Sequence, residues 1–129
     1  KEKKDRVEDA IYATKAALKE GIVPGAGVAL HNAADSINTE VVTEKILLDA
    51  IKMPYKTILA NAHINYGPNM KEGEGVNVVT GKNCNLVKEG IIDPVLVTRT
   101  ALVNAISVAT TILSADCVIS NIRINESSK

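Results

Sequence analysis

Apolar residues recur at helical spacing along most of the chain. The longest such run covers residues 2–20, where Val7, Ile11 and Leu18 lie on one stripe and Gly21 follows as a natural stop. The same spacing predicts four more helices, over about 25–36, 40–52, 55–62 and 95–113. We therefore expect a mainly α fold, a bundle of helices.

Two short stretches between the last two helices favour β-structure. "GVNVVT" (75–80) and "CNLVKEG" (84–90) predict a small antiparallel hairpin that turns at "GKN" (81–83). "DCVIS" (116–120) predicts a C-terminal edge strand. The Gly- and Pro-rich stretch 65–75 predicts a loop.

Several residues mark expected helix ends. Thr39 is a possible cap for the third helix, and Pro54 breaks or restarts that helix. Asp93 directly precedes Pro94. Because an Asp accepts from free N–H groups and a Pro suits the first helical position, this pair predicts the start of the last helix, with Asp93 as its N-cap.

Composition and charge argue against some classes of binding partner. The chain has 129 residues, about one domain, and 46% of them are hydrophobic but only 2% aromatic, so the core should be aliphatic. Fifteen basic and fifteen acidic residues cancel, which gives no bulk attraction to nucleic acid or anionic lipid. No apolar run reaches the roughly 18 residues of a membrane span. We expect neither a nucleic-acid nor a membrane partner.

The two cysteines, Cys84 and Cys117, are too few for a secreted disulfide scaffold. They favour reduced thiols in a cytoplasm or an organelle matrix. The chain opens on "KEKKDRVEDA", in the middle of an apparent helix. We therefore expect it to be a piece of a longer protein.

The stretch "GIVPGAGVAL" (21–30) raises two readings. A helix that starts after Pro-Gly-Ala-Gly presents unpaired N–H groups, and glycine lets another molecule approach the backbone. Such loops hold phosphate or ribose, but they also serve as plain helix connections. The chain carries neither a Walker signature nor a Gly-x-Gly-x-x-Gly motif, so both readings stay open.

Three polar side chains have a structural and a functional reading each. Asp9 lies about 200° around its helix from Val7, so it is either solvated or offered to a partner, a water or Mg²⁺. Asn77 either ends the hairpin or reads an adenine edge. Asp93 either caps its helix or takes ribose hydroxyls. His31 and His63 lack metal-ligand spacing, and we expect no metal site in the chain.

Taken together, three runs carry a resemblance to a known family. They are "RVEDAIYATKAALKEGIVPGAGVAL" (6–30), "GVNVVTG" (75–81) and "GIIDPVLVTRTALVNAISVATTIL" (90–113). In order and spacing they resemble the C-terminal part of group I chaperonins of the GroEL type, over nearly the whole chain. The resemblance implies that residues 1–19 are the returning helix of the intermediate domain. It implies that residues 20–129 are the C-terminal half of the equatorial domain, a helical bundle that binds ATP and forms ring contacts.

The resemblance also implies roles for single residues. Asp9 matches the family's catalytic Asp, which helps to activate the attacking water. The remaining matches are nucleoside contacts: Gly25 and Ala26 in the loop, Asn77, Val78 and Val79 in the hairpin, and Asp93 at the ribose.

Three departures from the family pattern stand out. Ala26 replaces a usual Gly, which tightens the approach to ribose, and Val78-Val79 replaces a usual Ala-Ala. The Gly-Met-rich tail is missing after "NESSK".

The chain also lacks the Asp-Gly-Thr-Thr phosphate loop, the Mg²⁺-ligating Asp and the apical domain. The implied cofactors are ATP and Mg²⁺, with phosphate and Mg²⁺ ligands outside these residues. The implied partners are a homo-oligomeric ring, unfolded polypeptides and a co-chaperonin, in bacterial cytoplasm or an organelle matrix. We expect the chain alone to hydrolyse no ATP. The alternative function is a helical self-assembly module with no nucleotide role.

Overall fold

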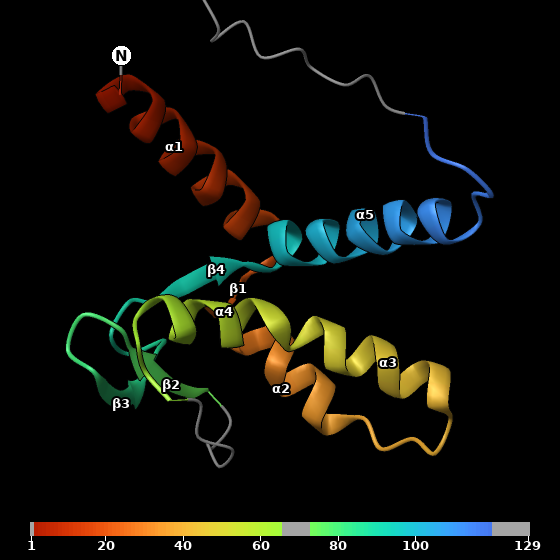
Figure 1. The fold of residues 1–129 in the computed structure, drawn as a ribbon. Coiled ribbons are helices and arrows are strands. Elements are labelled where there is room, and N and C mark those ends of the chain that lie inside the picture. Colours follow the sequence, from red (N-terminus) through yellow and green to blue (C-terminus); the bar gives the residue numbers. More distant parts are fainter. Residues whose placement is uncertain (1, 66–72, 120–129) are drawn as a thin grey trace, which may run out of the picture.

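The structure is a computed structural model that describes residues 2–65 and 73–119. Within that part, long helices α1 and α5 lie above a body of shorter helices and a hairpin (Figure 1). The elements are α1 (Glu2–Glu20), β1 (Ile22–Pro24), α2 (Val28–Ser36), α3 (Val42–Ile51), α4 (Met53–Asn61), β2 (Glu74–Asn77), β3 (Lys82–Asn85), β4 (Ile92–Pro94) and α5 (Val95–Leu113). The prediction of a mainly α fold is confirmed.

All five predicted helices form, and α1 and α5 have the predicted ends. Helix α2 begins at Val28 instead of near Gly25, because the residues before it make a separate turn. Thr39 is not the cap of α3, and that prediction is wrong: the N-cap position belongs to Val41, and no side chain caps the helix. The Thr39 hydroxyl lies ahead of the helix, where it accepts the N–H of Val41 at 3.1 Å and donates to the Glu44 carboxylate. Pro54 falls in the first turn of α4, where its missing N–H leaves no helical bond unmade.

The predicted hairpin forms, but its turn is earlier and its strands are shorter. β2 and β3 pair antiparallel from Glu74↔Asn85 to Asn77↔Lys82. The Asn77 side-chain oxygen accepts the N–H of Val79 at 3.0 Å, which ends β2 and moves the turn to residues 78–81. Asn85 ends β3 in the same way by accepting the N–H of Lys88 at 3.0 Å, so the prediction of a strand to residue 90 is wrong.

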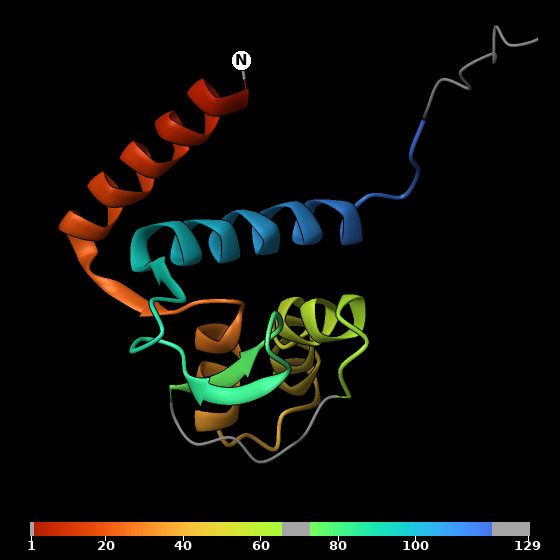
Figure 2. The ribbon, with the colours of Figure 1, turned by 90° about the vertical axis from the view of Figure 1, so that its left-hand side faces the viewer.

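A second strand pair was not predicted from the sequence. β1 and β4 pair antiparallel, with Val23 opposite Asp93 and Pro24 opposite Ile92. The Gly25 N–H extends the pairing by donating to the Ile91 carbonyl at 2.9 Å. This pair joins the α1–α2 connection to the start of α5 and lies between the upper helices and the body (Figure 2).

The C-terminal edge strand predicted over 116–120 is wrong for residues 116–119, which form no strand. A strand needs a neighbour for its backbone groups, and no strand lies beside these residues in the described part of the chain. Residue 120 lies outside the described residues. So does most of the loop predicted over 65–75.

The core lies between α2, α4 and the hairpin. Val28, Leu59, Val76 and Leu86 are buried there, as the aliphatic composition led us to expect. One aromatic residue joins them, because the Tyr55 ring is also fully buried and meets the His31 ring edge-on at 5.5 Å between centroids.

Helix α5 lies across the body, with apolar residues of the helix facing apolar residues of α2 and α3. A cavity of about 320 Å³ separates Leu102 and Ile106 of α5 from Leu30, Leu47 and Ile51 of the helices below. At 19 residues and a mean hydropathy of 1.5, α5 is long and apolar enough to cross a membrane by length and composition alone. Ser, Thr and Asn interrupt its apolar series, so a search of the sequence for an uninterrupted apolar run does not detect this helix, whereas its mean hydropathy does.

Helix α1 is held at its C-terminal end. Its described residues are exposed apart from the buried Ala16 and a few half-buried neighbours. Arg99 of α5 binds Glu20 with two hydrogen bonds, from Nε at 3.2 Å and from Nη2 at 2.5 Å. Gly21 ends the helix at φ +86° and donates to the Ala17 carbonyl at 2.8 Å.

The turn before α2 packs directly on the start of α4. Gly27 has φ +78°, and a Cβ there would lie 2.8 Å from the Tyr55 backbone nitrogen and 3.3 Å from the Pro54 carbonyl carbon. These neighbours are backbone atoms, which cannot move away as a flexible side chain can. Gly27 is therefore required both for its conformation and for its lack of a side chain.

We expect Gly27→Ala to lower the free energy of unfolding by about 2–4 kcal/mol, because it combines left-handed strain with overpacking. Gly81→Ala is the matched control: Gly81 has φ +68° but open space around its Cβ position. That variant should lose only about 1 kcal/mol. Urea unfolding measures both, and equal losses would contradict the packing argument.

Candidate functional site

The turn of residues 25–27 lies against the entry to β4. A Cβ on Gly25 would lie 3.2 Å from the carbonyl carbons of Ile91 and Ile92. Gly25 is thus needed for packing within the chain. Its carbonyl accepts the N–H of Val28 at 3.1 Å, which closes the turn and starts α2.

Ala26 stands at the middle of this turn with φ +56°. A residue with a Cβ is strained in this left-handed conformation, and such strain tends to gather at functional sites. Ala26 is half-buried.

Asp93 is not the N-cap of α5, and that prediction is wrong. The N-cap position belongs to Pro94, and no side chain caps the helix. The reason is that β4 continues through Pro94 in extended pairing with β1, so the helix starts later. The first α5 amide, that of Val95, donates to the Gly21 carbonyl at 3.1 Å instead.

The Asp93 side chain lines a cavity of about 280 Å³ between α1 and the β1–β4 pair. The other lining residues are apolar or small, and they are Ala13, Thr14, Ala17, Ile22, Ile92 and Pro94. The structure gives the Asp93 carboxylate no hydrogen-bond donor within the described ranges. Burial raises the pKa of Asp93 above its ordinary value of 3.8.

Asp9 lies on α1 one turn before Ala13, which lines that cavity. Residues four apart on a helix share a face, and side chains tilt toward the helix N-terminus. Asp9 therefore lies on the same face of α1 as the cavity-lining Ala13, but outside the cavity, and it is exposed. Gly25 and Asp93 thus lie at the β1–β4 pair, whereas Asp9 lies further along α1 and no described contact joins it to them.

Asn77 ends β2 of the other strand pair, and Val78 and Val79 lie in the turn that follows it. They do not line the cavity beside Asp93. The structural reading of Asn77 is confirmed, because its Oδ1 ends β2, yet no described residue accepts from its Nδ2 group. Val79 is 91% exposed at the hairpin tip, so the tip is open to a partner molecule.

One polar cluster was missed by the sequence reasoning. Asp35 accepts from Lys52 Nζ at 2.6 Å and lies 3.3 Å from Nδ1 of His31, which is only 3% exposed. The hydrogen bond from Lys52 is the main cause that holds the pKa of Asp35 below its usual value. The four-residue spacing of His31 and Asp35 on one helix face was the available signal.

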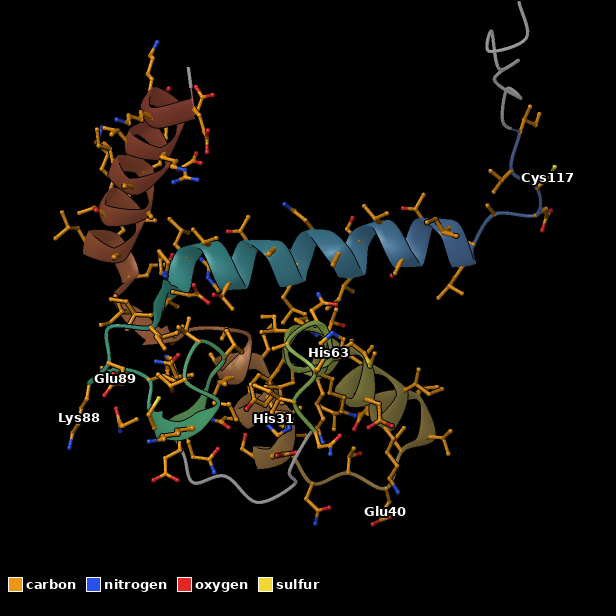
Figure 3. All side chains as sticks on the ribbon, turned by 60° about the vertical axis from the view of Figure 1, so that its left-hand side comes forward. His31, Glu40, His63, Lys88, Glu89 and Cys117 are labelled. Atoms are coloured by element: carbon orange, nitrogen blue, oxygen red, sulfur yellow. The ribbon has the colours of Figure 1, made fainter. Side chains whose placement is uncertain are left out.

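The remaining metal-ligating side chains are scattered. Figure 3 shows Cys117 beyond the end of α5, far from His31 and His63. Among residues 2–65 and 73–119, no three of the His, Cys, Asp and Glu side chains group so that they could hold a metal ion. Nothing in this part of the chain therefore fits Mg²⁺.

Comparison with protein families gives a match over nearly the whole chain. The model described as the TCP-1/cpn60 chaperonin family matches residues 1–123. The match covers α1, both strand pairs and α5, and so includes every residue discussed above.

The raised pKa of Asp93 has a consequence for stability. Because the folded-state pKa lies above the unfolded value of 3.8, stability falls as pH rises through that interval and stays lower above it. We expect Asp93→Asn to be at least as stable as the parent at pH 7. The gain should vanish below about pH 3.8, where the carboxyl is protonated in both states. Urea unfolding at pH 7 and pH 3 measures the difference.

Asp93→Ala is the control for a capping role. A lost N-cap would lower stability by about 1 kcal/mol at pH 7. A loss of that size in the Ala variant, with none in the Asn variant, would restore the capping reading.

Proposed function

Because the chain belongs to the TCP-1/cpn60 chaperonin family, we propose that it is part of an ATP-dependent protein-folding chaperonin of group I. In this proposal residues 1–19 are the returning helix of an intermediate domain and residues 20–129 half of an equatorial domain. The chain supplies the nucleoside side of an ATP site and the carboxylate that assists hydrolysis. The single observation that carries the proposal is the Asp93 carboxylate, half-buried in a cavity and without a donor among the described residues.

A ribose fits the environment of Asp93. A carboxylate accepts hydroxyl protons, and charge-assisted hydrogen bonds of this kind are strong where water is excluded. Burial leaves the charged form of Asp93 poorly solvated, so ribose hydroxyls would replace the missing water. The neighbouring turn of Gly25 and Ala26 would lie along the nucleoside, and the Asn77 Nδ2 group would donate to an acceptor on the base.

Asp9 suits the hydrolytic role by its position. It stands on the cavity side of α1, one turn beyond Ala13, and its carboxylate is exposed. A carboxylate there would accept a proton from the attacking water or orient it, as a general base does. Asp9 touches neither Asp93 nor the turn through any described contact, so it can serve the phosphate end while the turn serves the nucleoside.

Phosphate and Mg²⁺ binding are proposed to lie outside these 129 residues. Phosphoryl transfer needs positioned phosphates and a metal that neutralises their charge, and the described residues offer no fitting ligand group. We therefore expect no ATP turnover above background by the chain alone. Turnover abolished by Asp9→Ala would contradict this limit.

The assembly role rests on exposed apolar surface. Ile112 and Leu113 at the end of α5 are well exposed, as are Val7 and Leu18 of α1. Exposed apolar residues that gather on one face mark interaction sites. We propose subunit contacts of a homo-oligomeric ring there. Unfolded polypeptides and a co-chaperonin would bind elsewhere in the assembly, in bacterial cytoplasm or an organelle matrix.

Adenosine tests the nucleoside site, since it needs no phosphate ligands. We expect weak binding in the millimolar range, and about tenfold weaker binding of 2′,3′-dideoxyadenosine, because a hydrogen bond to a charged group is lost. Asp93→Ala should bind both ligands equally weakly. Chemical-shift titration in NMR measures all four affinities, and shifts should appear at Gly25, Ala26 and Asn77.

The comparison of adenosine with dideoxyadenosine tests whether Asp93 binds the ribose hydroxyls. If the parent chain bound adenosine and dideoxyadenosine alike, Asp93 would not hold ribose. If neither ligand shifted any resonance near the turn, the nucleoside site itself would be refuted.

The second candidate is the self-assembly module without a nucleotide role, which the exposed end of α5 favours. Such a module would ignore adenosine but would depend on its apolar surface. We expect Ile112→Asp to shift sedimentation toward monomer, while Ser107→Asp, on another face of the same helix, should not. Equal behaviour of the two variants would exclude α5 as the assembly face.

A further inference from the structure

We draw no further inference here: the strongest candidate, the apolar cavity of about 320 Å³ between α5 and the helices α2 and α3, is lined by side chains such as Leu30, Leu47 and Leu102, but nothing in the structure shows what covers it.

Discussion

The pairing of β1 with β4 is the interaction on which the arrangement of the other elements depends. Only three residues from each strand take part, yet they connect the end of α1, the start of α2 and the start of α5. The same pairing keeps Asp93 in extended backbone beside α1 and sets Gly25 against Ile91. Without it, the loop and the carboxylate would belong to unrelated parts of the surface. This very short sheet thus holds the ends of three helices together.

The body below this junction depends on close backbone packing. Gly27 meets the start of α4 and Gly75 meets Leu86 and Val28, so glycines let the turn and the hairpin approach the buried Tyr55, Leu59 and Val76. The core is small for a chain of this length, and much apolar surface on α1 and α5 remains exposed. Such a division fits a protein whose outer helices find their partners in an assembly.

Periodicity was enough to predict every helix, because each has a repeated apolar stripe. It failed where the outcome depends on distant residues. Ile22, Val23 and Pro24 become a strand only because Ile92 and Asp93 lie beside them, and the same pairing delays α5 and removes the cap assigned to Asp93. The hairpin turn was placed too late because the Asn77 side chain closes it locally. Residues 116–119, which lack a neighbour strand in the described part, did not follow their β-propensity. For the site, the resemblance supplied Asp9, Gly25, Ala26 and Asp93 as a set, and local motifs alone did not.

The attachment of α1 at one end has a mechanical consequence. Asp9 lies twelve residues from Gly21, which is about 18 Å along a helix that rises 1.5 Å per residue. Over such a lever arm, a rotation of about 10° at Gly21 would displace Asp9 by about 3 Å, the length of a hydrogen bond. The position of this carboxylate is therefore governed by the joint at the far end of the helix, where Glu20 and Arg99 meet, more than by anything near Asp9 itself.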